Sequence, residues 1–204
     1  MKSSILITAF QRLIPFKIKF KNQSRSQRLL AFLVRWYIPN YLSHYTTVVG
    51  RSIYFPNAEA LEKRHSAYTI AHEMVHLLDQ RRLTLPLFLL LYLSPQIFAI
   101  GVLLFPWLGY EALYFLLFGL PWPSPGRVYL EGRAYALEIA LYERCNEKYN
   151  VESILEIFQS SGYYYMSWKR KMVRKQIDRW TKIITEKSDP ILNQVVITFE
   201  SCLS

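Results

Sequence analysis

The chain has 204 residues, which is enough for one domain with a substantial hydrophobic core. Hydrophobic residues make up 51% and aromatic residues 16%, a composition that is rich for a soluble protein but does not match a polytopic transporter. The formal net charge is +10. The two cysteines, Cys145 and Cys202, form neither a CxxC pair nor a disulfide-rich pattern, which predicts reduced thiols in a cytosolic compartment.

Residues 1–45 form a basic arm. Every charged residue before Glu59 is basic: Lys2, Arg12, Lys17, Lys19, Lys21, Arg25, Arg28, Arg35 and Arg51. Apolar and basic residues alternate in this arm as they do in amphipathic helices that lie on lipid. We therefore expect it to contact an anionic membrane surface, although such charge can also serve solubility alone. No known nucleic-acid motif accompanies it, which disfavours a nucleic-acid partner, and the apolar run at 5–10 is too short for a secretory signal.

The following elements are predicted from periodicity and from turn residues. In chain order they are a helix at 27–38, a short β-hairpin at 46–56, a polar turn or short helix at 58–65, and a helix at 67–82. The last of these contains the sequence HEMVH at residues 72–76.

The histidines of HEMVH lie four residues apart, so on a helix they share one face and can bind a single ion. Glu73 lies beside His72 without having to act as a ligand. A carboxylate in that place can act as the general base toward a water on the metal. We predict that His72 and His76 bind Zn²⁺ and that Glu73 is catalytic. The alternative is a pair of ordinary buried helix histidines.

An apolar segment follows, with no Lys or Arg from Leu83 to Gly126 and one acid, Glu111. Its first stretch, 86–105, is long enough to cross a hydrocarbon core of about 30 Å, and a second, shorter stretch covers 107–120. We expect 86–120 to enter the bilayer as two crossings or as one deep re-entrant hairpin, because the chain must return to the metal helix. A helical hairpin buried inside a larger assembly is the alternative.

Basic residues flank this apolar segment on both sides: Arg81, Arg82, Arg127 and Arg133. The turn between its two stretches has none, so both ends are expected on the cytoplasmic side. These arginines are expected to lie near anionic headgroups.

The next predicted helix, at 128–148, offers a third metal ligand. Glu131 and Glu138 lie seven residues apart on one face, with Tyr135 between them. We choose Glu131 because it lies where the chain returns from the apolar segment. His44 and His65 are the other donors of suitable type.

The motif HEMVH, followed by a glutamate on a later helix, resembles the gluzincin group of zincin metallopeptidases. The wider phrase "HEMVHLLDQRR…LLYLSP…GRVYLEGRAYALE" is similar to small zincin-like proteins of bacteria and phages that carry an apolar insert. The resemblance covers about residues 46–145. It implies a zincin-like fold, a Zn²⁺ cofactor and a polypeptide substrate. By this likeness His72, His76 and Glu131 are the zinc ligands and Glu73 is the base.

The sequence departs from thermolysin-like relatives in one place. Those relatives carry an aspartate four residues after the ligand glutamate, where this chain has Tyr135. Asp79 is therefore expected to orient an imidazole instead, with Glu138 as a further carboxylate near the ligands. Tyr135 is a candidate to stabilise the oxyanion or, alternatively, a packed helix tyrosine. The stretch GRSIYF at 50–55 is expected to be the strand that pairs with substrate.

Three further elements complete the chain: a short helix at 151–160 that ends at Ser161-Gly162, a long basic amphipathic helix at 163–184, and an extended tail from Pro190.

We therefore predict a mainly α (α+β) chain with three parts: the arm at 1–45, a zincin-like domain at 46–149 and a basic helix with its tail at 150–204. The function expected is that of a membrane-associated zinc endopeptidase whose catalytic side faces the cytoplasm. A non-catalytic structural or assembly protein with the same fold, for example from a phage particle, is the alternative. Nothing in the sequence indicates an oligomeric state.

Overall fold

The computed structural model describes residues 3–35, 38–160, 163 and 165–203, and the chain in it is mainly helical with one small sheet. The elements of the N-terminal half are α1 (Ser3–Leu13), β1 (Lys17–Phe20), η1 (Lys21–Gln23), α2 (Arg25–Val34), α3 (Tyr41–His44), β2 (Thr47–Val49), β3 (Ser52–Phe55), α4 (Ala58–Glu62) and α5 (Ser66–Leu83). The remaining elements are α6 (Leu85–Leu93), η2 (Gln96–Leu104), α7 (Phe105–Leu108), η3 (Gly109–Gly119), α8 (Pro125–Arg144), α9 (Val151–Gln159), α10 (Arg170–Thr185) and α11 (Pro190–Glu200).

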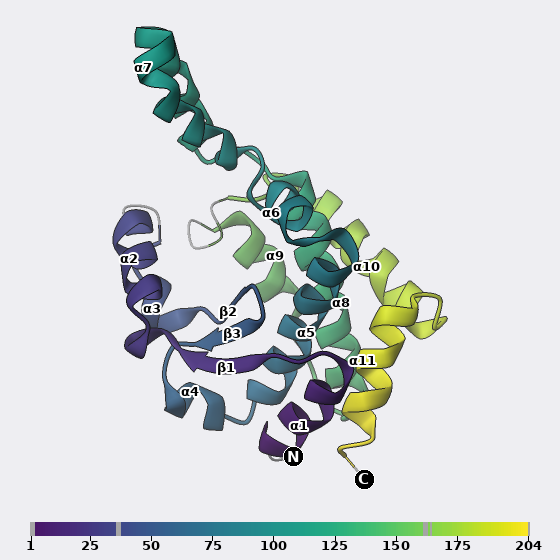
Figure 1. The fold of residues 1–204 in the computed structure, drawn as a ribbon. Coiled ribbons are helices and arrows are strands. Elements are labelled where there is room, and N and C mark those ends of the chain that lie inside the picture. Colours follow the sequence, from purple (N-terminus) through teal and green to yellow (C-terminus); the bar gives the residue numbers. More distant parts are fainter. Residues whose placement is uncertain (1–2, 36–37, 161–162, 164, 204) are drawn as a thin grey trace.

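The sheet contains three strands in the order β1-β3-β2 (Figure 1). The predicted hairpin is confirmed, since β2 pairs antiparallel with β3 around a turn at Gly50, whose φ of 57° suits glycine. The third strand is a finding that the sequence did not indicate: β1 pairs parallel with β3. Residues 3–20, expected to belong to a peripheral arm, are thus part of the domain, and α1 buries Leu6 and Phe10 in its core.

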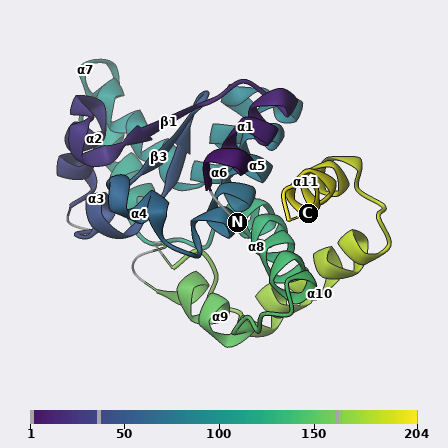
Figure 2. The same cartoon turned by 90° about the horizontal axis from the view of Figure 1, so that it is seen from below.

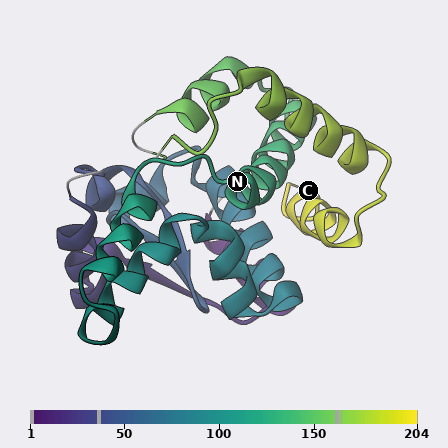
Figure 3. The same cartoon turned by 90° about the horizontal axis from the view of Figure 1, so that it is seen from above.

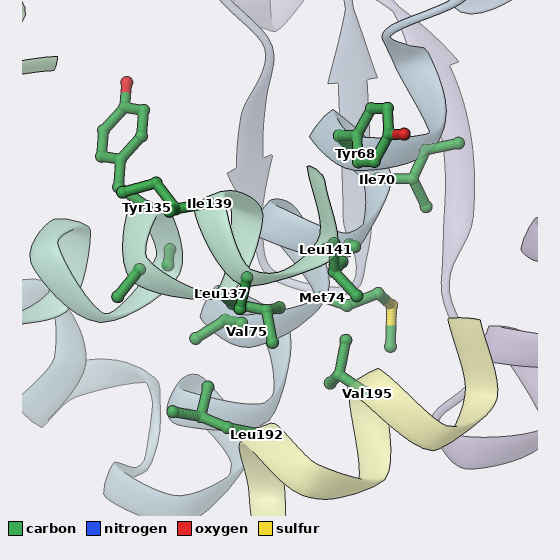
Figure 4. Close-up of a cluster of buried hydrophobic side chains, with 14 of the residues drawn as sticks. Tyr68, Ile70, Met74, Val75, Tyr135, Leu137, Ile139, Leu141, Leu192 and Val195 are labelled. Atoms are coloured by element: carbon green, nitrogen blue, oxygen red, sulfur yellow. The ribbon is translucent and has the colours of Figure 1, made fainter. Parts of the chain in front are cut away.

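The core lies where α5, α8 and α11 meet. Val75 from α5, Leu137 from α8, and Leu192 and Val195 from α11 lie together in Figure 4, and each is at most 2% exposed. Fully burying one such side chain stabilises the fold by about 1.5–3 kcal/mol. Because α5 and α8 are both buried along most of their length, the side chains at their interface are held in fixed positions.

Several helices begin at polar side chains that accept a hydrogen bond from the first turn, as helix N-caps commonly do. These residues are Ser24 for α2, Asn57 for α4, Ser124 for α8, Asn150 for α9 and Asp189 for α11. The cap at Asp189 explains why the expected extended tail is wrong. Pro190 occupies the first turn of α11, where a missing N–H costs nothing.

The basic amphipathic helix of the C-terminal part is α10, which begins at Arg170, later than the residue 163 predicted. Its apolar face consists of Val173, Ile177, Trp180 and Ile184, all buried. This face packs on α8, beside which α10 runs in Figures 2 and 3. The amphipathic pattern therefore reflects packing in the core, not a surface for lipid. The predicted break at Ser161-Gly162 lies outside the described residues.

The apolar segment divides into two parts. The first part, α6, packs against α5 and α8. The second part is a hairpin of residues 96–119, in which η2 and η3 lie antiparallel and α7 forms the tip, and it projects away from the rest of the molecule (Figure 1). Phe98 stacks edge-to-face with Phe118, and a Cβ on Gly101 would lie 2.3 Å from the Phe115 ring, so the two arms are in close contact.

By length and composition alone, Gln96–Gly119 is the one stretch among the described residues that is apolar enough to cross a membrane, and only 6% of its most apolar window is buried. The chain nevertheless reverses direction at Gly109, whose φ is 57°. The arms contain 9 and 11 residues. At about 2 Å per residue in a 3₁₀ helix, the hairpin extends roughly 20 Å, which is less than a hydrocarbon core of about 30 Å.

Candidate metal centre

The HEMVH sequence lies in the middle of α5, as predicted. His72 and His76 are one turn apart on the same face of this helix, and their ring centroids are 5.1 Å apart in an edge-to-face arrangement. Both side chains are buried, with 6% and 5% of their surface exposed. Such burial is possible because α5 is covered on nearly all sides.

Glu131 reaches the two imidazoles from α8, which packs against α5. Its Oε2 lies 3.3 Å from Nε2 of His72, and its Oε1 lies 3.6 Å from Nε2 of His76. One donor atom from each of the three residues falls within 4.8 Å of the others. The structure thus brings together the three side chains that were predicted as metal ligands, and this group could hold a metal ion.

The hydrogen bonding of this group fits a cation. Both ring nitrogens of His76 and Oε2 of Glu131 are buried without a hydrogen-bond partner among the described residues. Leaving a buried polar atom unsatisfied costs about 1–3 kcal/mol, so such atoms usually have a partner. Two imidazoles and one carboxylate form the donor set of catalytic Zn²⁺ sites that keep one position open.

The charges within the group are mutually dependent. Burial lowers the pKa of His72, but the neighbouring carboxylates of Glu131 and Glu138 outweigh it and raise that pKa to about 10. Burial raises the pKa of Glu131, but His76 and His72 outweigh it and lower that pKa well below its ordinary value. The carboxylates therefore favour positive charge at this point of the molecule, as a bound cation would require.

Glu73, the predicted base, is buried at 6% exposed, and its carboxylate makes no hydrogen bond to a described residue. Burial raises its pKa, although His72 and His76 act in the opposite direction. A carboxylate that is adjacent to the imidazoles and has no partner of its own is free to exchange a proton with a group bound there.

Two carboxylates were expected to support the imidazoles, and the structure separates their roles. Glu138 Oε2 lies 3.2 Å from Nδ1 of His72, where it can orient that ring. Asp79 instead binds Arg133, whose guanidinium also forms two hydrogen bonds to Asp189, at 2.8 and 2.9 Å. The reason is that Arg133 is itself buried, at 2% exposed, and requires both acids. Arg133 was expected near lipid headgroups, and its burial corrects that expectation.

Tyr135 lies beside the site, and its ring stacks edge-to-face on His72 at 4.6 Å between centroids. Its hydroxyl is 2.8 Å from the hydroxyl of Tyr163. The geometry therefore gives this hydroxyl a partner in the core and supports the packed role of Tyr135. The two other histidines lie elsewhere: His65 contacts Tyr142, and His44 is exposed beside Ser43.

Tyr92 of α6 is a site residue that the sequence analysis missed. Its hydroxyl donates a hydrogen bond of 2.5 Å to Oε1 of Glu131. The rings of Tyr92 and Phe88 lie 6.0 and 6.1 Å from His76. The only sequence signal was that Tyr92 is the one side chain in α6 with a polar atom.

Lys21, the first residue of η1 directly after β1, is a second buried group that was not anticipated. Its Nζ donates to the carbonyl of Tyr41 at 3.0 Å and lies 3.7 Å from the centroid of the Tyr41 ring. Burial lowers its pKa to about 7, although the charge of Glu73 raises it. In the sequence this lysine cannot be distinguished from the other basic residues of the arm.

The strand expected to pair with substrate needs correction. Most of GRSIYF forms β3, which is hydrogen-bonded on both sides, to β1 and to β2. A strand in the centre of a sheet has no free edge for another chain. Among the described strands, β2 has one free edge and packs against α5.

Comparison of this chain with protein-family models, with curated proteins and with solved structures finds no match.

Proposed function

We propose that this chain is a membrane-associated zinc-dependent endopeptidase of gluzincin type with a zincin-like fold. The observation that carries the proposal is the buried cluster of His72, His76 and Glu131, in which Glu73 lies beside the ligands and binds none of the described side chains. A zinc site that is only structural has four protein ligands and no use for such a carboxylate.

In this proposal His72, His76 and Glu131 hold the ion and Glu138 orients the ring of His72 through Nδ1. Bound zinc supplies Lewis-acid activation of a water and of the substrate carbonyl. Glu73 takes the proton from the attacking water and transfers it to the leaving amine, so its carboxylate serves first as base and then as acid.

The proposed substrate is a polypeptide in extended conformation. An extended chain adds to the free edge of a sheet through main-chain hydrogen bonds. β2 is such an edge and packs against the helix that carries the histidines. We therefore assign substrate pairing to Thr47–Val49 in place of residues 50–55.

Membrane association is proposed from the hairpin of residues 96–119. It is the most exposed apolar part of the chain, with Trp107, Tyr110 and Tyr114 between 71% and 83% exposed. Exposed apolar surface of this extent indicates a partner phase. The hairpin is too short to cross the bilayer, so it enters one leaflet and returns to the same side, which we assign to the cytoplasm. Arg81 and Arg82, exposed before the apolar segment, then lie near anionic headgroups.

The proposal is tested by metal content and by peptide cleavage measured on the same preparations. Wild type should contain one zinc per chain, and the double variant His72→Ala, His76→Ala should contain none. Glu73→Gln should retain zinc and lose cleavage of unfolded or membrane-protein substrates, because only the base is removed. Glu131→Gln should weaken zinc binding, whereas Glu143→Gln, an exposed glutamate on the same helix, should not. Equal metal content in wild type and the double variant would end the proposal.

A non-catalytic assembly protein, for example in a phage particle, is the second candidate. The observation that favours it is the burial of all four residues, since none of His72, Glu73, His76 and Glu131 exceeds 6% exposure. Zinc binding without cleavage, together with a Glu73→Gln gene that fully replaces wild type in the organism, would favour this candidate over the enzyme.

A further inference from the structure

The hydrogen bond from Tyr92 to Glu131 joins the apolar segment to the metal centre. Tyr92 lies on α6, near the base of the hairpin, and its hydroxyl donates to Oε1 of Glu131 at 2.5 Å. An oxygen–oxygen distance this short is typical of a hydrogen bond to a carboxylate. The two residues are 39 positions apart in the sequence.

The position of Tyr92 is itself fixed by the start of α8. Arg127 Nε donates to the carbonyl of Tyr92 at 2.9 Å, and its guanidinium lies 5.0 Å from the centroid of the Tyr92 ring. Gly126 allows this approach, because a Cβ at that position would lie 2.3 Å from the carbonyl oxygen of Leu91. The end of α6 therefore cannot shift relative to α8 without losing these contacts.

The consequence for Glu131 is that its two oxygens are no longer equivalent. Oε1 accepts the hydrogen bond from Tyr92, whereas Oε2 has no hydrogen-bond partner among the described residues and lies 3.3 Å from Nε2 of His72. A carboxylate held by one oxygen presents the other in a single orientation. Groups that hold a ligand in this way commonly determine metal affinity.

We propose that Tyr92 is a positioning residue that holds Oε1 of Glu131 and thereby presents Oε2 to the metal. The proposal rests on the metal centre proposed above. By this proposal α6 belongs to the metal site, whereas the hairpin of residues 96–119 does not. The two parts of the apolar segment therefore have different roles, one at the metal site and one at the membrane.

The test is the variant Tyr92→Phe, which keeps the ring beside His76 and removes only the hydroxyl. We expect its zinc affinity, measured by competition with a chromophoric chelator, to fall about 10- to 100-fold. We also expect the visible spectrum of the Co²⁺-substituted protein to change, because that spectrum reports the geometry of the ligands. Tyr110→Phe, at the tip of the hairpin, is the matched control and should leave both unchanged. Replacing residues 96–119 alone should also leave zinc affinity unchanged.

Four outcomes decide the matter. Reduced affinity together with an altered Co²⁺ spectrum in Tyr92→Phe alone supports the proposal. Wild-type affinity and spectrum in Tyr92→Phe would overturn it while leaving the metal centre intact. Unchanged affinity with lost cleavage would overturn it as well, since Tyr92 would then act on the reacting group and not on Glu131. Absence of metal from the wild type would remove the proposed function, and this inference with it.

Discussion

The α5–α8 interface buries polar side chains, whereas the hairpin of residues 96–119 exposes apolar ones. α5 carries two histidines, two acids and a glutamine, yet nearly every residue from Ser66 to Gln80 is buried. The hairpin carries one charged residue, Glu111, yet only Ala112 is buried in its two long arms. Composition alone would have assigned the core to the wrong region.

This difference shows which residues need an explanation. Burying polar groups is unfavourable unless they are paired, so those at the α5–α8 interface must serve a purpose, either a binding site or a salt bridge. Large exposed apolar patches are rare on soluble proteins, so the exposed apolar side chains of the hairpin are the basis of the membrane contact proposed above.

Removing the hairpin is the strongest test of the comparison. Residues 96–119 can be replaced by a short polar linker, because the chain segments on either side of the hairpin are joined by a hydrogen bond of 2.9 Å from Arg127 Nε to the carbonyl of Tyr92. We expect partitioning to anionic vesicles to fall by at least about ten-thousandfold, since each CH₂ group buried in lipid contributes about 0.8 kcal/mol. Flotation of vesicles measures this.

Residues 86–120 were expected to enter the bilayer, but the replacement must not begin at residue 86, because α6 carries Phe88 and Tyr92, which contact the candidate metal site. Replacing Leu29, Phe32 and Leu33 on α2 by serine is the matched control. These residues are also exposed and apolar, but they lie outside the hairpin and should affect partitioning much less. Release of the intact chain by high salt alone would contradict lipid insertion.

The buried salt bridge gives the next largest effect. Arg133→Ala leaves Asp79 and Asp189 as unpaired buried acids, so the free energy of unfolding should fall by about 3–5 kcal/mol. Urea unfolding followed by circular dichroism measures it. Arg144 lies on the same helix as Arg133 and forms an exposed salt bridge with Glu200. Arg144→Ala removes that salt bridge and should change the free energy of unfolding by less than about 1 kcal/mol. Equal effects of the two variants would show that the buried pairs are not formed.

The smallest effect is a pH dependence caused by Lys21. Its pKa is about 7 in the folded chain against 10.5 ordinarily, so between these values the unfolded chain binds more protons. Stability must therefore rise with pH across this window, by up to about 1.4 kcal/mol per pH unit.

Lys21→Met lacks this titration, so its stability relative to wild type should decrease as pH rises from about 7.5 to 9.5. Urea unfolding at the two pH values measures the difference. Lys19→Met, two residues earlier on β1 and exposed, serves as control. A pH-independent difference between Lys21→Met and wild type would mean that burial does not lower the pKa of this lysine and that it stays charged in the folded chain.

The sequence predicted those parts whose patterns are local. Two histidines four apart fix their own geometry on a helix, and Gly50 with β-branched neighbours indicates a turn between strands. The choice of Glu131 over Glu138 depended on where the chain re-enters the domain after the apolar segment, and the structure brings Glu131 into the cluster.

The parts that were missed depend on tertiary partners. Basic residues in β1 hid a strand, because the alternation that the period-two pattern requires is carried by Ile18 and Phe20 alone. α11 is visible in the sequence, since Leu192, Val195, Val196 and Phe199 repeat at helical spacing, but Pro190 led to the prediction of an extended tail. The partners of Arg133 could not be found, because they lie 54 and 56 residues away.

The salt bridge between Arg133 and Asp189 also depends on the order in which the chain is synthesised. A ribosome makes α5 and α8 well before α11, so the guanidinium of Arg133 has its Asp79 partner early but must wait for Asp189, which in turn caps α11. A chain interrupted before residue 189 would carry the complete HEMVH motif and Glu131, yet would lack the element that closes the core behind them. Truncated products that lack α11 would therefore not hold His72, His76 and Glu131 in the positions that the complete core gives them.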